Sequence, residues 1–303
     1  MNRLYPLTLA ACLLSPQALA ETPAPRDAFV SQLLQQMTQE EKIGQLRLIS
    51  IGGQDMPREK FLQEVAAGRI GGTFNSITRA ENRRIQQAAL QSRLKIPLLF
   101  AYDILHGHRT IFPISLGQAA TWNLEAIRLA ARTSAIEGSA DGLDLTFAPM
   151  VDISRDPRWG RVSEGFGEDP WLVSRIAETS VRAYQGTSLA APDSLMASVK
   201  HFALYGAVEG GRDYNVVDMS PLRMHQDYLP PYRAALDAGA GAVMVALNTV
   251  NGVPATANRW PMQDLLRQPS GFRGLTTSAH AALSEPLPPG LARDAPAAPP
   301  VAR

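Results

Sequence analysis

Residues 148–169 read APMVDISRDPRWGRVSEGFGED and follow an apolar run at residues 143–148 that is typical of a buried strand. Three glycines interrupt any helical or strand period in this stretch, so we expect a loop. The loop carries two arginines, Arg158 and Arg161, among four acidic residues. Loops held by a rigid scaffold often supply binding and catalytic groups. The alternative is a solvated surface loop whose charged side chains only form salt bridges with one another.

Apolar runs of strand length alternate with helical patterns on both sides of this loop. We expect strands at residues 46–51, 70–74, 96–102, 143–148, 195–202, 241–247 and 274–278. We expect helices at residues 28–37, 60–67, 79–94, 124–138, 170–185, 221–238 and 260–266. A further helix should begin after Thr38, and Pro230-Pro231 should kink or split the helix that contains them.

This order of elements predicts an α/β fold built on a parallel sheet. The alternation has no topological break, which favours a (β/α)8, TIM-barrel-like domain over a doubly wound sheet. An eighth strand is not recognisable in the sequence, so we expect the barrel to be incomplete, with its last strand missing.

Length and composition indicate a globular chain with a sizeable core. The 303 residues suit one large or two ordinary domains, and 45% of them are hydrophobic and 19% charged. The formal net charge is +1 and no basic stripe is present, so we expect neither a nucleic-acid partner nor binding to an acidic membrane surface.

The first twenty residues have the layout of an export signal. Arg3 gives a positive start, residues 4–14 are apolar, and a small-x-small cleavage site ends at Ala20. We therefore expect cleavage after Ala20 and a periplasmic or secreted protein. The residues ending at Cys12 also resemble a lipoprotein box, but the apolar run continues past it, which favours simple secretion. Cys12 is the single cysteine, so the mature chain should have no disulfide and no thiol nucleophile.

The amino-acid composition of the chain changes near residue 284. Residues 284–303 are rich in alanine and proline and have no periodicity, so we expect disorder there. The predicted organisation is a signal peptide at 1–20, a barrel domain at 21–283 and a disordered tail at 284–303. We find no apolar run long enough to span a membrane outside the signal segment.

Several predicted strands lead into polar residues at their C-terminal ends, which is where barrels place their active sites. Asp103 follows the strand at 96–102, Arg158 and Arg161 follow the strand at 143–148, and Lys200-His201 end the strand at 195–202. A carboxylate accepts hydrogen bonds from hydroxyls, whereas lysine, arginine and histidine donate them. The set suits a neutral, polyhydroxylated ligand, and Trp159 or Trp122 would lie against the apolar face of a sugar.

Each of these residues also has a structural interpretation. In this interpretation Asp103 would pair only with Arg109. Lys200 would belong to a structural ion pair, because a lone buried charge is costly. His201 would be a core histidine whose hydrogen bonds are all made within the protein. His106 and His108 have no third ligand nearby, so we expect no metal site. Phosphate-binding, dinucleotide-binding and GxSxG motifs are not found, and we expect no cofactor.

With these residues in view, the chain is similar to glycoside hydrolase family 3, in its periplasmic bacterial β-glucosidase branch. The similarity extends over about residues 30–278. Its long motifs, in order, are LLQQMTQEEKIGQL (33–46), YDILHGHRTIFPISLG (102–117), APMVDISRDPRWGRVSEGFGEDP (148–170), SVKHFALYGAVEGGRDYN (198–215), VDMSPLRMHQDYLPPYRAALDAGAGAVMVALN (217–248) and NGVPAT (251–256).

The resemblance implies an N-terminal barrel domain that holds the non-reducing terminal sugar of a β-glucoside or oligosaccharide. It implies an exo-acting, retaining hydrolase that releases β-D-glucose. Carried onto this chain, Asp103 resembles the carboxylate that binds the outer sugar hydroxyls. The remaining substrate-binding residues that the resemblance implies are Arg161 together with Arg158, Lys200 and His201.

The chain departs from the family where catalysis would occur. The family nucleophile is an aspartate in a motif like T-V-S-D-H, whereas residues 276–280 read TTSAH and place Ala279 at that position. The acid/base residue of this branch comes from a C-terminal domain, which we expect to be absent. We therefore expect an impaired β-glucosidase, a truncated or altered gene product. A non-catalytic glucoside-binding pseudoenzyme is the alternative, and a fragment without function is a third possibility.

Overall fold

The computed structural model describes residues 25–51, 56–268 and 270–279. The predicted signal peptide and tail lie outside these residues. The chain divides into two compact units, the first ending at Thr38 and the second beginning at Gln39. Helix α1 (Pro25–Gln36) is the described element of the first unit. All of the sheet belongs to the second.

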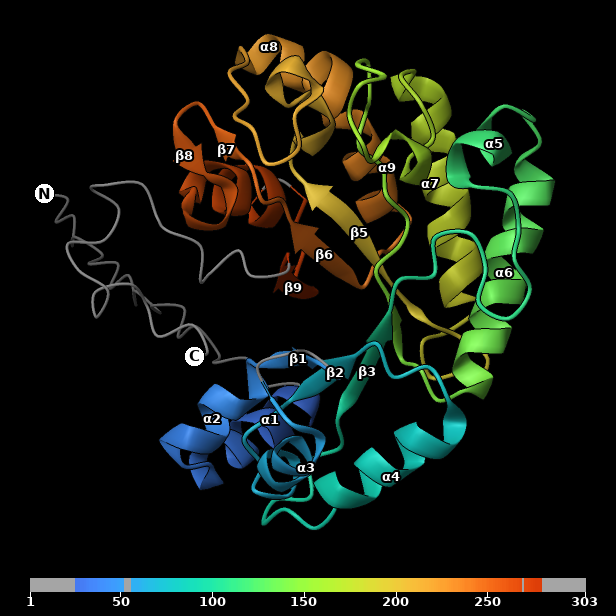
Figure 1. The fold of residues 1–303 in the computed structure, drawn as a ribbon. Coiled ribbons are helices and arrows are strands. Elements are labelled where there is room, and N and C mark those ends of the chain that lie inside the picture. The colour runs from blue at the N-terminus through green and yellow to red at the C-terminus, as the bar shows by residue number, and fades with distance from the viewer. Residues whose placement is uncertain (1–24, 52–55, 269, 280–303) are drawn as a thin grey trace, which may run out of the picture. The chain divides into compact units, whose positions relative to one another are not determined.

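A seven-stranded sheet forms the framework of the second unit, in the order β1-β2-β3-β4-β5-β6-β9 with every neighbouring pair parallel. Its strands are β1 (Leu48–Ser50), β2 (Gly72–Phe74), β3 (Leu99–Tyr102), β4 (Leu145–Thr146), β5 (Met196–Phe202), β6 (Ala242–Val245) and β9 (Leu275–Ser278). The sheet curls (Figure 1), and within the described residues no strand pairs with the outer edge of β1 or of β9. The predicted parallel strands are confirmed, and within the described residues the sheet forms part of a barrel without closing it.

Helices follow most strands, as the alternation predicts. They are α2 (Gln39–Gln45), α3 (Arg58–Ala66), α4 (Arg79–Ala89), α5 (Ser115–Ala119), α6 (Leu124–Ala140), α7 (Pro170–Gln185), α8 (Pro221–Arg223) and α9 (Pro230–Asp237). Short 3₁₀ turns are η1 (Val162–Glu164), η2 (Tyr205–Ala207), η3 (Glu209–Gly211) and η5 (Ala255–Ala257), and π-helical segments are η4 (Met224–Tyr228) and η6 (Trp260–Arg267).

Local chemistry explains where these helices start. The Asn123 side chain accepts a hydrogen bond from Ala126 N at the start of α6, and Asp169 accepts one from Leu172 N at the start of α7. The predicted split at Pro230-Pro231 is confirmed, because η4 ends at Tyr228 and α9 begins at Pro230. A proline cannot donate the hydrogen bond that a continuous helix requires, so it starts a new one.

A short hairpin, β7 (Thr249–Val250) with β8 (Val253–Pro254), was missed by the strand prediction. Asn251 and Gly252 form its turn, and both have positive φ, 49° and 82°. An Asn-Gly pair between apolar residues is a strong hairpin signal, so the sequence contained the information. The strands are only two residues long, which is why no alternating pattern revealed them.

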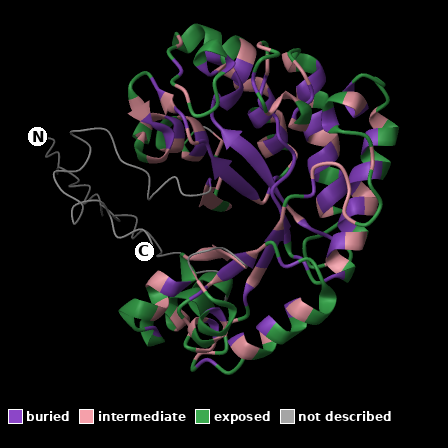
Figure 2. Ribbon diagram, viewed as in Figure 1, coloured by how far each residue is buried: buried purple, intermediate pink, exposed green. Residues whose placement is uncertain are grey.

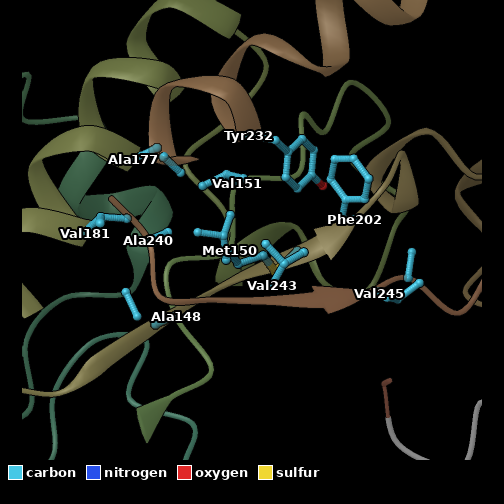
Figure 3. Close-up of a cluster of buried hydrophobic side chains, with 14 of the residues drawn as sticks. Ala148, Met150, Val151, Ala177, Val181, Phe202, Tyr232, Ala240, Val243 and Val245 are labelled. Atoms are coloured by element: carbon cyan, nitrogen blue, oxygen red, sulfur yellow. The ribbon is translucent and has the colours of Figure 1, made fainter. Parts of the chain in front are cut away.

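The core lies between the sheet and the helices that cover its outer face. Figure 2 shows β5 and β6 largely buried and the outward surfaces of the helices exposed, whereas the outermost strands β1 and β9 are only partly buried. Figure 3 shows how side chains of β5 and β6 meet those of α7 and α9, with the Tyr232 ring beside the Phe202 ring. These two rings pack edge to face with centroids 5.3 Å apart. Helix α9 is thereby fixed against β5, the strand that ends in Lys200 and His201.

Candidate functional site

A cleft of ≈ 1680 Å³ opens at the sheet, and several predicted site residues line it. The residues that line it include Asp103, Arg161, Glu164, Lys200, His201, Tyr214 and Ala279. They come from the ends of β3, β5 and β9 and from the loops after β4 and β5. The fold therefore brings together residues that are up to 176 positions apart in the chain, because parallel strands all end on the same side.

Lys200 and Asp103 form an ion pair across the sheet. Lys200 Nζ lies 2.5 Å from Asp103 Oδ1. The Lys200 side chain is 3% exposed, whereas the Asp103 side chain is 48% exposed and reaches solvent in the cleft. Asp103 does not pair with Arg109, which instead donates from Nε to Asp141 Oδ2 at 2.9 Å. The predicted partner of the buried ammonium is thus found, and it is itself a site residue.

Arg161 is held by Glu164 through two hydrogen bonds, Nε to Oε1 at 2.6 Å and Nη2 to Oε2 at 2.8 Å. Burial lowers the pKa of Arg161, but the Glu164 carboxylate more than offsets this, so the pKa is raised. Burial likewise raises the pKa of Glu164, and the hydrogen bonds from Arg161 reverse the effect, leaving the pKa lowered. Both groups are therefore charged, and Glu164 Oε2 also lies 3.9 Å from Lys200 Nζ.

His201 lies against a fully buried carboxylate, Asp152. Asp152 Oδ2 is 3.0 Å from the His201 backbone nitrogen and 2.9 Å from the ring Nδ1. The Tyr232 hydroxyl donates to Asp152 Oδ1 at 2.8 Å. Burial lowers the pKa of His201, Asp152 opposes this shift, and the nearby positive charges of Lys200 and Arg161 add to it. His201 is therefore neutral at neutral pH.

Sequence analysis missed Asp152, Tyr232 and Glu164. Asp152 reaches His201 because the segment at 149–151 runs beside the end of β5: Val151 N donates to Lys200 O at 2.9 Å, and Lys200 N donates to Pro149 O at 3.1 Å. The Glu164 pairing has a sequence signal, since it stands three residues after Arg161 and a single turn joins them. Tyr232 has no such signal, because α9 brings it from 31 residues beyond His201.

The structure does not bring Arg158 together with the other predicted residues. Arg158 binds Asp156 through Nε and Nη2 and its side chain is 72% exposed, and it does not line the cleft. The hydrogen bonds from Arg158 lower the pKa of Asp156 to about 2. Trp159 is 1% exposed, and Trp122, although 66% exposed, does not line the cleft, so neither tryptophan is placed to stack on a ligand there.

The two histidines of the loop after β3 are engaged in hydrogen bonds. His106 Nδ1 lies 3.0 Å from Phe112 O, and His108 Nε2 lies 2.8 Å from Asp141 Oδ2. Within the described residues, no group of three or more His, Cys, Asp and Glu side chains is arranged to hold a metal ion. In the same part of the chain, no helix has the length and apolar character needed to cross a bilayer.

Ala279 lies directly after β9 and lines the cleft, and it is 4% exposed. Its neighbours in a small apolar cluster include Ala101 and Met244. Arg267 holds β9 in place, because it donates to Gly274 O at 3.1 Å and to Thr276 Oγ1 at 2.6 Å. Position 279 is thus firmly placed in the cleft but offers only a methyl group.

Asp213 ties the loop after β4 to the loop after β5. Its Oδ1 accepts hydrogen bonds from Trp159 Nε1 at 3.1 Å and from the Tyr205 hydroxyl at 2.5 Å. The Arg161 guanidinium lies over the Tyr205 ring, 5.5 Å from its centroid. Asp213 therefore supports the ring beneath Arg161.

Replacing Asp213 by alanine should lower the free energy of unfolding by about 1–2 kcal/mol, because the Trp159 and Tyr205 donors both lose their acceptor. The loss stays in this range because water can reach the position and replace part of the hydrogen bonding. Urea denaturation followed by tryptophan fluorescence measures this. Asp213→Asn keeps an acceptor oxygen and should lose less than half as much stability. Equal stabilities for the wild type and Asp213→Ala would contradict this role.

Comparison with known proteins identifies relatives of this chain. Residues 38–296 match the profile of the glycosyl hydrolase family 3 N-terminal domain. A periplasmic β-glucosidase of Salmonella typhimurium is 55% identical, over 97% of this chain and 40% of that protein. A lysosomal β-glucosidase of Dictyostelium discoideum is 29% identical, over 84% of this chain and 35% of that protein. The chain thus spans about two fifths of the length of these relatives.

Solved structures of a β-glucosidase and a β-glucanase resemble the fold of this chain. The β-glucosidase of Listeria innocua in complex with glucose superimposes with a TM-score of 0.82 at 41% identity, covering 89% of this chain and 40% of that chain. An exo-1,3/1,4-β-glucanase of Pseudoalteromonas superimposes with a TM-score of 0.78 at 27% identity, covering 87% of this chain and 36% of that chain. This likeness confirms the TIM-barrel-like fold class.

Proposed function

Because the chain belongs to glycosyl hydrolase family 3, we propose that its cleft binds the terminal glucose of β-glucosides. The observation that carries the proposal is the convergence of Asp103, Arg161 and Lys200 on one cleft, with His201 beside them. A mixture of charged donors and an exposed carboxylate is suited to a neutral ligand whose hydroxyls both donate and accept hydrogen bonds.

The ion pairs within the site leave hydrogen-bond donors and acceptors available for a ligand. Lys200 has three N–H donors, and Asp103 occupies one of them. Arg161 uses Nε and Nη2 for Glu164, and its Nη1 makes no hydrogen bond within the described residues. Asp103, half exposed, retains acceptor sites for sugar hydroxyls. A bound sugar therefore adds to the ion pairs without breaking them. Arg158 belongs to the predicted set, but it does not line the cleft and its guanidinium binds Asp156.

The proposed ancestral reaction is exo-acting, retaining hydrolysis that releases β-D-glucose. That reaction needs a carboxylate nucleophile beside the anomeric carbon and a carboxylic acid about 5–5.5 Å from it. A methyl group at Ala279 cannot form a glycosyl ester, and Glu164 and Asp103 are both engaged in ion pairs. We therefore propose that the chain as it stands hydrolyses glucosides very poorly. Ala279 favours non-catalytic glucoside binding as the second candidate function.

The cellular location is proposed from two observations. One relative is a periplasmic β-glucosidase, and residues 1–20 have the layout of an export signal with cleavage after Ala20. A periplasmic or secreted protein is consistent with both. The predicted domain boundaries, 21–283 for the barrel and 284–303 for the tail, are retained as part of the proposal.

Titration calorimetry with glucose and hydrolysis of p-nitrophenyl β-glucoside together test the function. We expect saturable glucose binding by the full chain and no release of nitrophenol above the uncatalysed rate. Arg128→Ala, which removes an exposed arginine paired with Glu125 on α6, is the matched control and should bind glucose like the wild type. Absence of glucose binding would overturn the binding proposal. Turnover that survives extensive purification would overturn the account of Ala279.

A further inference from the structure

Three buried groups, of which His201 lines the cleft, form a closed hydrogen-bonded unit. Asp152, His201 and Tyr232 are 1%, 2% and 2% exposed. The Asp152 carboxylate lies within 3.0 Å of the His201 backbone nitrogen, the His201 Nδ1 and the Tyr232 hydroxyl. The Tyr232 hydroxyl also lies 2.5 Å from His201 O. Each member touches both others, so the position of each proton is constrained.

The protons of this unit can be assigned from what each group is able to do. A backbone N–H can only donate, so Asp152 Oδ2 is an acceptor. Burial raises the pKa of Asp152, but His201 and Tyr232 outweigh this and the pKa is lowered, so the carboxyl is ionised and has no proton to give. Burial raises the pKa of Tyr232 well above its usual value of 10, so its hydroxyl keeps its proton. His201 Nδ1 must therefore donate.

A neutral imidazole has one N–H, so a proton on Nδ1 leaves a lone pair on Nε2. Within the described residues, Nε2 of His201 makes no hydrogen bond, and His201 lines the cleft. The Tyr205 ring packs edge-on against the imidazole at 5.2 Å and an interplanar angle of 82°, which restricts rotation of the ring. The lone pair is thus held in one orientation.

We propose that Asp152 and Tyr232 are positioning residues that fix His201 as a hydrogen-bond acceptor at Nε2, so that the site selects sugars with a free hydroxyl at one ring position. This inference rests on the proposed function, because it assumes that a sugar occupies the cleft. It reverses the sequence-based expectation for His201, which assigned it a donor role.

This assignment predicts that replacing one sugar hydroxyl by fluorine weakens binding at the ring position that meets His201. The ammonium of Lys200 and the guanidinium of Arg161 donate hydrogen bonds. A fluorine substituent on the sugar still accepts such hydrogen bonds weakly. Fluorine has no proton to give to Nε2. At the ring position that meets His201, the deoxyfluoro sugar should therefore bind as poorly as the deoxy sugar, about 10- to 100-fold more weakly than glucose, because a buried acceptor is left unpaired. At positions that meet Lys200 or Arg161 alone, the fluoro sugar should bind better than the deoxy sugar.

The tautomer is measured without any ligand. Long-range ¹H–¹⁵N correlation spectra of the full chain at neutral pH resolve the two ring nitrogens, and His201→Gln identifies the His201 signals. We expect a protonated Nδ1 and an unprotonated Nε2. Asp152→Asn keeps an acceptor oxygen and should keep this tautomer, whereas Asp152→Leu should shift part of the population to the form protonated on Nε2. A purely structural role for Asp152 would not move the tautomer.

Calorimetry with glucose and its 2-, 3-, 4- and 6-deoxy and deoxyfluoro analogues tests the specificity. The position that is sensitive to fluorine through His201 should lose that sensitivity in His201→Leu. A proton on Nε2 in the wild-type spectrum would overturn the proposal whether or not glucose binds. An unchanged fluorine penalty in His201→Leu would overturn the selectivity. If glucose fails to bind while Nδ1 is protonated, the proposed function fails and the tautomer assignment stands. If Asp152→Leu does not fold, the wild-type and Asp152→Asn spectra still decide.

Discussion

Asp103→Ala is expected to abolish measurable glucose binding and to destabilise the chain more than Lys200→Met, although both variants break the same ion pair. The Lys200 side chain is 3% exposed, and among the described residues the one other carboxylate that pairs with its ammonium is Glu164, 3.9 Å away. Asp103 is 48% exposed and can be hydrated when Lys200 is removed. Urea denaturation should show a loss of about 1–3 kcal/mol for Asp103→Ala, less than for a fully buried pair because water reaches the Asp103 position.

Lys200→Met should cost less than about 1 kcal/mol, because a flexible apolar side chain of similar length fills the same space. Both variants should lose glucose binding, since each removes a predicted hydrogen-bonding partner of the sugar. Arg128→Ala serves again as the control, because it removes an exposed ion pair on α6 that does not line the cleft. A larger loss of stability in Lys200→Met than in Asp103→Ala would contradict this account of the pair.

Asp103 and Lys200 also illustrate what sequence could predict. Both stand where apolar strands end, and parallel strands bring their C-terminal ends together, so the sequence was enough to expect them in one cleft. Which charge would pair with which was not predictable from position alone. Arg109 is much nearer to Asp103 in the chain than Lys200 is, yet Arg109 binds Asp141 at the C-terminal end of α6.

Arg158 and Arg161 show a second limit. The two arginines lie three residues apart in one loop and have the same chemistry, so composition could not separate them. Backbone geometry separates them. The 3₁₀ turn η1 follows Arg161 and places Glu164 beside its guanidinium, whereas Arg158 binds Asp156, two residues before it. Tyr232 marks a third limit, since its contact with Asp152 depends on how α9 packs against β5, a tertiary arrangement without a local pattern.

Ala279→Asp is expected to turn a non-reacting chain into one that forms a covalent glucosyl ester. We expect 2,4-dinitrophenyl β-glucoside to give a burst of about one phenolate per chain, because this leaving group departs without protonation and only the nucleophile is required. Removal of a nucleophile typically costs about 10⁴-fold or more in rate, so the gain should be of that size. Mass spectrometry of the peptide containing position 279 should show one added glucosyl unit.

Unactivated glucosides should remain poor substrates of this variant, since the lowered pKa of Glu164 leaves it without a proton for a leaving oxygen and Asp103 is paired with Lys200. Ala279→Asn is the matched control, because it has nearly the size of the aspartate variant but no carboxylate. Arg267 fixes β9 through Thr276 in both variants, so the introduced side chain should reach the cleft from the same backbone position. An adduct in Ala279→Asn or in the wild type would show that another group attacks the sugar. No adduct in Ala279→Asp, with glucose binding intact, would show that position 279 does not face the anomeric carbon.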